Sequence, residues 1–309
     1  MATTKRPTSP GAEALIGVVH HVLDHGEVEL VDYMGTDEQL ARVARVSTGS
    51  ERQDTGILGF LVRHSHSSPI EFGKLELRIK LPIFVDRQWY RHRTGRGGGE
   101  YEGFTTPSHE AAFGTLSERS LRYQPPLNDA YVPAADFCQA KMAAGVKQGR
   151  GATMNAAHAG RARAEFMDAN ESAINSYQAL SAPFDEGDGY PGAAAELARS
   201  VLPLGTYTEW YWTIDAHNLM HWLRLRLDGH AQKEIRAYAE VVYQIFKAWL
   251  PALAQAFDDY VLGAVTFSAK ELSALAKTGL SASLLQPGDH GMSAGELNEF
   301  AIKLGKICP

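Results

Sequence analysis

The sequence is poor in the features that mark secreted, membrane-spanning and nucleic-acid-binding proteins. Its 309 residues include only two cysteines, Cys138 and Cys308, which lie far apart and indicate a reducing compartment. No apolar run approaches the ~20 residues of a membrane span, and the first residues are polar, without a signal-peptide core. The 36 acidic residues outnumber the 30 basic ones, which leaves no positive excess for a nucleic-acid backbone. We therefore expect a cytoplasmic protein that binds neither a membrane nor a nucleic acid.

Several common catalytic motifs are also missing. The sequence has no GxxxxGK[ST] loop, no GxGxxG between strand and helix, no GxSxG elbow and no CxxC pair. His64 and His66 lie two positions apart, and His217 and His221 lie one helical turn apart, but no HExxH pattern accompanies them. These histidines could form the zinc site of a metal hydrolase or serve as polar contacts; we predict no metal.

What remains is a globular chain with 44% apolar residues, long enough for a substantial core. We expect a disordered segment over 1–12, one catalytic domain over 13–264 and a C-terminal extension over 265–309. The best strand signal is the strict alternation over 75–81, which is typical of a half-buried antiparallel strand. Residues 94–117 have no clear period and are predicted to be an inserted loop.

The remaining expected elements follow from caps and periodicity. A strand over 27–35 precedes a helix over 37–46 that opens with a Thr36…Gln39 capping box, and further helices are expected over 54–64, 159–181, 193–201, from Asp215 and from a Ser293…Glu296 box. A long amphipathic helix follows Gly229, and its apolar stripe is either core or a subunit interface. That stripe consists of Ile235, Tyr238, Val242, Ile245 and Trp249.

The most unusual segment is RQWYRHRTGRGGGEYEGF, residues 87–104. Arg87, Arg91 and Arg93 surround His92 and are interleaved with aromatic residues directly after an apolar strand. The planar guanidinium fork suits phosphate and the edge of a pyrimidine. The three glycines that follow could let backbone N–H groups approach a phosphate or could form a flexible loop. The cluster predicts a site for an anionic ligand such as a nucleotide.

Two further arginines, Arg199 and Arg226, lie among apolar residues of predicted helices. A charge in such a position is costly unless it is paired, so we expect each to meet a carboxylate or a bound anion.

Five segments, in this order, resemble the flavin-dependent thymidylate synthase family: RHSHSSPIE, PIFVDRQWYRHR, SERSLRY, ARSVLPLGTYTEWYWT and LRLRLDGHAQKEI. The similarity runs over about residues 27 to 262. It implies that reduced FAD and methylenetetrahydrofolate deliver a methyl group to C5 of dUMP, that NADPH reduces the flavin, and that no cysteine attacks the pyrimidine. Neither Cys138 nor Cys308 lies in a polar motif, which agrees with the last point.

The resemblance and the order of elements together imply an α/β (α+β) fold, with a mainly antiparallel sheet, flanking helices and a helical C-terminal half. The resemblance also implies a homotetramer whose active sites are shared between subunits.

The resemblance assigns roles to particular residues of this chain. The positions that match nucleotide-binding residues are Gln88, Arg91, Glu118, Ser120, Arg122, Arg199 and Arg226. The positions that match residues near FAD are Ser47, His66, Ser68, Glu71, His92, Arg93, Asp215, His217, His221 and His230. Within these sets, Arg226 would stabilise the ionised pyrimidine, a task suited to a permanently charged group, and His66 would lie near flavin and folate.

The chain also departs from the family pattern. The 94–117 insertion separates RHR from the substrate segment, and Ser117 stands where the family has asparagine. Asp215 and His221 replace asparagines, His217 replaces an arginine and Phe72 replaces a histidine. These changes leave two alternatives open: hydroxymethylation of dUMP or dCMP at C5, and a flavin-binding or nucleotide-binding protein without synthase activity.

Overall fold

The computed structural model describes residues 6–47, 49, 54–90, 114–127, 129–142, 149–182, 190–275 and 292–307. The chain divides into two compact units, Met1–Leu262 and Gly263–Pro309. The helices of the first unit are α1 Pro10–Glu13, α2 Asp37–Arg45, α3 Ile57–Arg63, α4 Ile83–Trp89, α5 Ala156–Ser181, α6 Ala195–Ala198, α7 Ala216–Arg226, α8 Lys233–Trp249 and α9 Pro251–Phe257. Short 3₁₀ turns η1 Ile70–Phe72, η2 Ala135–Phe137 and η3 Arg199–Val201 and a π-helical turn η4 Asp258–Leu262 complete that unit.

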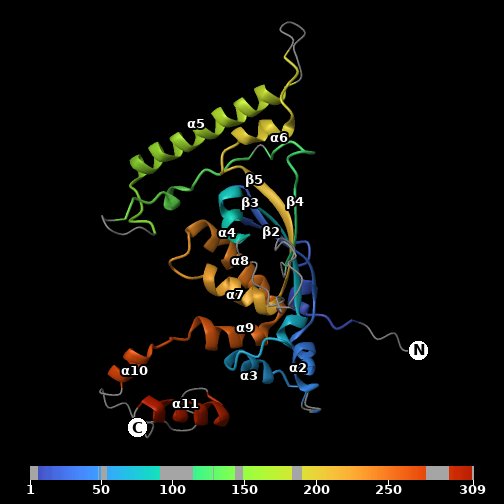
Figure 1. Ribbon diagram of the computed structural model, residues 1–309, viewed down its shortest axis with the longest axis vertical. Helices are drawn as coiled ribbons and strands as arrows, with labels where there is room; N and C mark the ends of the chain where they lie inside the picture. The colour runs from blue at the N-terminus through green and yellow to red at the C-terminus, as the bar shows by residue number, and fades with distance from the viewer. Residues whose placement is uncertain are drawn as a thin grey trace, which may run out of the picture. The chain divides into compact units, whose positions relative to one another are not determined.

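An antiparallel sheet of five strands forms the centre of the first unit (Figure 1). The strands are β1 Val19–Val22, β2 Gly26–Met34, β3 Lys74–Pro82, β4 Gly114–Glu118 and β5 Tyr207–Asp215, in the order β1-β2-β3-β5-β4. The predicted alternation of β3 is confirmed, since Leu75, Leu77, Ile79 and Leu81 are all buried. The predicted fold, a mainly antiparallel sheet with flanking helices, is confirmed as well.

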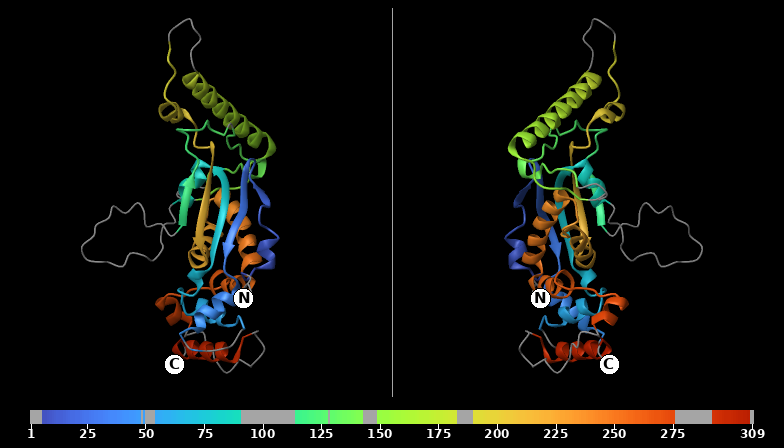
Figure 2. Two further views of the ribbon diagram at one scale, coloured as in Figure 1. Left: turned by 90° about the vertical axis from the view of Figure 1, so that its right-hand side faces the viewer. Right: turned by 90° about the vertical axis from the view of Figure 1, so that its left-hand side faces the viewer.

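Helices α7 and α8 pack against one face of the sheet (Figure 2). The amphipathic stripe of α8 answers the question left open by the sequence: Ile235, Tyr238, Val242, Ile245 and Trp249 are fully buried within the chain, so the stripe is core. The 26-residue helix α5 is different, because Ala159, Asn170 and Tyr177 are its only buried residues. It packs on α6, η2 and η3, and its other residues are half-buried or exposed.

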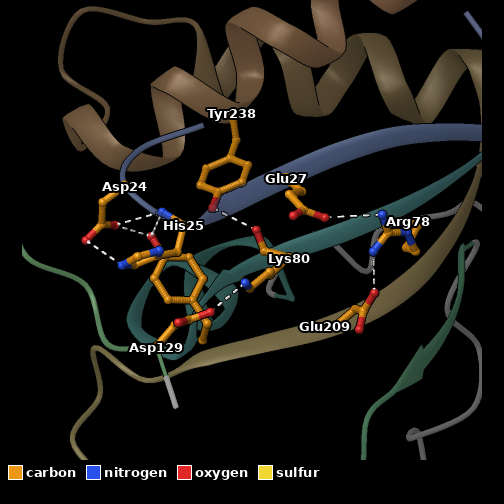
Figure 3. Close-up of polar contacts among 9 residues, drawn as sticks. Asp24, His25, Glu27, Arg78, Lys80, Asp129, Glu209 and Tyr238 are labelled. Atoms are coloured by element: carbon orange, nitrogen blue, oxygen red, sulfur yellow. Dashed lines mark hydrogen bonds and ion pairs between the residues drawn. The ribbon is translucent and has the colours of Figure 1, made fainter. Parts of the chain in front are cut away.

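The opposite face of the sheet is polar and is joined across strands by ion pairs (Figure 3). Arg78 on β3 contacts three carboxylates, those of Glu27 at 3.2 Å, Glu29 at 2.6 Å and Glu209 at 2.5 Å. Burial alone would lower the pKa of Arg78, but the carboxylates of Glu209 and Glu29 outweigh it and raise the pKa above its ordinary value. One guanidinium therefore links β2, β3 and β5.

The structure corrects two expectations. Residues 6–12 are ordered rather than disordered, because Ser9 is buried and its hydroxyl donates to the Trp249 carbonyl at 2.7 Å. Residues 114–117 belong to strand β4 rather than to a loop, since they pair with β5. In the described residues the C-terminal half is mainly helical, as predicted, and it also contributes β5, an interior strand of the sheet that lies between β3 and β4.

The second unit contains helices α10 Ala269–Leu275 and α11 Ala294–Ile307. The predicted capping box at the start of α11 is confirmed. The Ser293 N–H donates to the Glu296 carboxylate at 2.8 Å, and the Glu296 N–H donates to the Ser293 hydroxyl at 3.3 Å.

Candidate active site

A tryptophan stack joins the two helices that carry the best substrate candidates. Trp89 at the end of α4 and Trp222 in α7 lie with ring centroids 4.2 Å apart, and both are buried. The stack holds Gln88, the residue before Trp89, against Arg226, one turn beyond Trp222. As a result, the Arg226 Nη2 group donates to the Gln88 carbonyl oxygen at 2.8 Å.

Arg226 is half-buried and carries a charge that the described residues do not neutralise. Among these residues its side chain has no acidic partner, and its buried Nε–H has no hydrogen-bond acceptor. Burial lowers the pKa of this guanidinium, which nevertheless stays protonated at neutral pH. The expected carboxylate is thus not found in the described part of the chain, and the site is suited to an external anion or carbonyl oxygen.

Two carboxylates lie near one another on α4 and β4. Glu118 at the end of β4 accepts a hydrogen bond from the Thr208 hydroxyl at 2.8 Å. Asp86, two residues before Gln88, is affected by burial and by the nearby Glu118 charge, which together raise its pKa to about 6. Sequence reasoning missed Asp86; the available signal was a carboxylate inside the otherwise apolar helix start IFVD.

Of the other predicted nucleotide residues, Ser120 is half-buried, and Arg122 and Arg199 are exposed. Ser120 and Arg122 lie in the turn after β4, where the Ser120 hydroxyl accepts from the Arg122 N–H at 3.3 Å. Arg122 also lies over the Tyr123 ring at 5.3 Å from its centroid. Arg199 is exposed at the start of η3, so the expectation that it lies in an apolar stripe is wrong. Within the described residues no hydrogen bond or ion pair joins Arg199 to Gln88 or Arg226.

Three predicted flavin residues come together in a pocket of about 190 Å³ between α3, α7 and α9. His66, His217 and His221 line it, together with hydroxyl groups of Ser65 and Ser67 and the Arg224 side chain. Ser65 has a φ of 58°, a left-handed conformation that a non-glycine residue adopts at a cost. Burial, and then the charges of Arg224 and His217, lower the pKa of His221, so that this imidazole is neutral at pH 7.

The remaining flavin candidates lie outside this pocket. Asp215 is buried and caps α7, with its two carboxylate oxygens accepting from the Asn218 N–H at 2.9 Å and from the Asn218 side-chain amide at 2.7 Å. His230 is almost fully exposed and contacts Asp228 at 2.9 Å. The Ser47 hydroxyl donates to the Ala44 carbonyl at 3.2 Å. Ser68 and Glu71 lie on either side of the start of η1, exposed and half-buried respectively.

Part of the predicted site falls outside the described residues. Arg91, His92 and Arg93 lie there, as does the 94–113 part of the insertion. In the described portion of the chain, no three His, Cys, Asp or Glu side chains gather as a metal ion would require. Two larger cavities, of about 580 and 510 Å³, contain none of the residues predicted from the sequence.

Comparison with known proteins identifies the family of this chain. Residues 29–252 match the family described as thymidylate synthase complementing protein. The chain belongs to this family. It is an enzyme of the methyltransferase type, as its relatives are.

Named members of the family are similar over nearly the whole chain. A flavin-dependent thymidylate synthase from Ruegeria pomeroyi is 38% identical over 99% of this chain and 94% of its own length. One from Treponema denticola is 40% identical over 92% of this chain and 96% of its own length. Among solved structures, the UMP/dUMP methylase PolB from Streptomyces cacaoi, bound with 5-Br UMP, superimposes with a TM-score of 0.62 at 28% identity, over 76% of this chain and 94% of that one.

The length and hydropathy of the helices bear on membrane insertion. Among the described residues, no helix combines the length and apolar character needed to span a bilayer.

Proposed function

We propose that this enzyme is a flavin-dependent thymidylate synthase, which transfers a one-carbon unit from methylenetetrahydrofolate to C5 of dUMP with FAD and NADPH. The observation that carries the proposal is the half-buried Arg226, held against the Gln88 carbonyl without an acidic partner in the described residues. A cation fixed in this way can stabilise negative charge that develops on a pyrimidine ring. Relatives that carry the synthase name support the choice of reaction.

Gln88 and Arg226 would bind the base and the adjacent sugar. The guanidinium remains charged through the reaction, and its partial burial strengthens its attraction to a pyrimidine anion. The bond from Nη2 to the Gln88 carbonyl fixes the orientation of the planar group, so little reorganisation is needed when charge develops.

Ser120, Arg122 and Arg199 would bind the 5′-phosphate, together with Arg91 of the undescribed segment. A hydroxyl and guanidinium groups are well suited to phosphate. Because Arg122 and Arg199 are exposed and have no contact with Arg226 in the described residues, we infer that they act on the site of a neighbouring subunit in a homotetramer.

The pocket at His66, His217 and His221 would receive part of FAD. Its donor set of imidazoles, hydroxyls and the Arg224 guanidinium fits a pyrophosphate or the polar edge of a flavin ring. When bound there, FAD would supply the hydride that completes the methyl group, and NADPH would reduce the flavin. A neutral His221 can donate from one ring nitrogen and accept at the other, and His66 would lie where flavin and folate meet. Ser47, Ser68, Glu71, His92, Arg93, Asp215 and His230 remain proposed contacts of the same cofactor.

An anaerobic single turnover tests the proposal. The purified protein is mixed with NADPH, methylenetetrahydrofolate and dUMP, and the nucleotide product is analysed by mass spectrometry. We expect 5-methyl dUMP. Bound flavin that NADPH reduces, with no change in the nucleotide, would contradict the synthase reaction and leave a flavin-binding or nucleotide-binding protein.

The same experiment distinguishes the neighbouring reactions. A hydroxymethyl product contains one more oxygen atom than a methyl product. Replacing dUMP by dCMP shows which pyrimidine base the enzyme accepts. The hydroxymethyl alternative is motivated by the inserted segment and by the changed residues Asp215, His217 and His221. Asp215 caps α7, as asparagine also could, and the two histidines line the pocket. UMP is a further substrate to include, because PolB is named for both UMP and dUMP.

A further inference from the structure

A chain of hydrogen bonds runs from the side chain of Gln88 into the protein interior. The Gln88 Nε2 group donates to the Oε1 atom of Gln232, and the Nε2 group of Gln232 donates to the Glu234 carboxylate at 2.9 Å. Glu234 is 2% exposed, and its carboxylate also accepts from Arg150 and from the Tyr131 hydroxyl, the latter at 3.1 Å. Gln232 is the residue before α8, but its side chain makes no capping bond. It is therefore available to link its two partners.

The Glu234 carboxylate, at the buried end of this series of hydrogen bonds, determines how the Gln232 and Gln88 amides are oriented. Burial would raise the pKa of Glu234, but the hydrogen bonds from Arg150 and Gln232 outweigh burial and leave the pKa below its ordinary value. An ionised carboxylate only accepts hydrogen bonds, so Gln232 must turn its NH₂ group toward Glu234. The Gln232 oxygen must then face Gln88, and Gln88 must turn its own NH₂ group toward it. The Oε1 atom of Gln88 is left as an acceptor, and in the described part of the chain no donor reaches it.

We propose that Gln232 and Glu234 are positioning residues that hold the Gln88 amide in one orientation, so that its Oε1 atom accepts a hydrogen bond from the bound nucleotide. This inference rests on the proposed function, in which Gln88 contacts the nucleotide. An amide that could turn over would present either a donor or an acceptor and would discriminate poorly. The buried carboxylate removes that freedom because a reversed Gln232 would point its oxygen at Glu234.

The ligand group that this arrangement selects is a hydrogen-bond donor. In a pyrimidine deoxynucleotide such a donor is either the N3–H of uracil or the 3′-hydroxyl of the sugar. Cytosine has an unprotonated N3 in the same position, so an acceptor at Oε1 would disfavour it. Two analogues distinguish these two possible donors: dCMP lacks the N3–H, and 2′,3′-dideoxyuridine monophosphate lacks the 3′-hydroxyl.

The test measures equilibrium binding of dUMP and of both analogues to the FAD-containing protein. We expect the wild type to bind dUMP roughly tenfold more tightly than the analogue that lacks the recognised donor, the effect of one hydrogen bond. In Gln232→Met the Gln88 amide can turn over, so this ratio should fall to roughly twofold or less. Gln232→Glu keeps an acceptor facing Gln88, whether it is ionised or donates a shared proton to Glu234, and should retain the wild-type ratio.

Controls separate positioning from a general loss of structure. Gln255→Met removes a comparable glutamine bond to a carboxylate, that to Asp259 at 2.9 Å, on the exposed surface of α9 and should leave the ratios unchanged. If the methionine variant does not fold, Gln232→Asn, one methylene too short to reach both partners, takes its place with the same expectation.

Two results would overturn the inference: equal discrimination in the wild type and Gln232→Met, or no discrimination against either analogue by the wild type. Failure of the wild type to bind dUMP at all would instead contradict the proposed function.

Discussion

Replacing Asp86 by asparagine should stabilise the protein at high pH and have much less effect at low pH. The pKa of Asp86 is about 6 in the folded protein, against 3.8 for a freely solvated aspartate, with burial as the main cause and the Glu118 charge as the second. Because the folded state holds this proton more tightly, the stabilising contribution is complete below pH 3.8. It is lost as the pH rises through 6.

The size of the effect follows from these two values. A tenfold change in proton affinity corresponds to about 1.4 kcal/mol, so the ionised Asp86 costs the folded state about 3 kcal/mol at pH 8. At pH 4.5 the same calculation gives about 1 kcal/mol. Asparagine has nearly the same volume and no charge at either pH, so Asp86→Asn should gain these amounts over the wild type.

Urea unfolding at pH 4.5 and pH 8, followed by tryptophan fluorescence at one fixed protein concentration, measures both differences. Asp168→Asn, on the exposed surface of α5, is the matched control and should change the free energy of unfolding by less than about 0.5 kcal/mol at either pH. A gain for Asp86→Asn that is equal at both pH values, or a loss at pH 8, would show that Asp86 is not a carboxylate that burial keeps partly protonated.

Three further predictions concern the site and the sheet. Arg226→Met should lower kcat/KM by roughly 10²- to 10³-fold with little change in FAD content, and steady-state kinetics beside the flavin absorbance would measure both; parallel loss of the two would contradict its role at the pyrimidine. Ser120→Ala should raise the KM for the nucleotide about fivefold while kcat changes little, because one hydrogen bond to the phosphate is lost; a change confined to kcat would argue against phosphate binding. Arg78→Met should destabilise the fold by about 2 kcal/mol in urea unfolding, since Glu27, Glu29 and Glu209 would then repel one another, and the loss should shrink at acidic pH.

Local signals in the sequence predicted the elements that local chemistry determines. Thr36 and Ser293 were identified as helix caps from residue type and spacing alone, and both side chains accept the expected backbone N–H. The alternation in β3 and the apolar stripe of α8 were equally visible, because each repeats over several turns or residue pairs. Such patterns need no knowledge of distant partners.

The missed strands depend on pairing between distant segments. In β5 aromatic residues point to both faces, with Trp210 and Trp212 buried and Tyr211 exposed, so the alternation of apolar and polar residues is weak. Strand β4 follows a segment without period and is defined by its register with β5, in which Glu118 lies opposite Trp210. The sequence of either segment alone therefore does not indicate the strand that their pairing forms.

The residues of the candidate site also fall into two groups, those that a sequence motif identifies and those that only their surroundings identify. Gln88 and Arg226 were identified separately by the motifs that contain them, yet their contact joins residues 138 positions apart and depends on the Trp89–Trp222 stack. Asp86 and the Gln232–Glu234 pair were missed because their significance comes from what surrounds them. A carboxylate becomes informative only when its burial and its neighbours are known.

Helix α7 carries residues of both the proposed flavin pocket and the proposed nucleotide site. Its first turns carry His217 and His221 in the pocket proposed for flavin, and Arg226 ends it nine residues after His217, about 13 Å along the axis. Asp215 anchors the start of the helix, and the buried Trp222 anchors its middle against α4. The separation between the proposed flavin and nucleotide positions is therefore a property of one rigid helix. A side chain at residue 215 that could not cap the helix would weaken this anchor and displace both positions together. Aspartate and the asparagine of the family pattern both cap well, so this departure preserves the anchor.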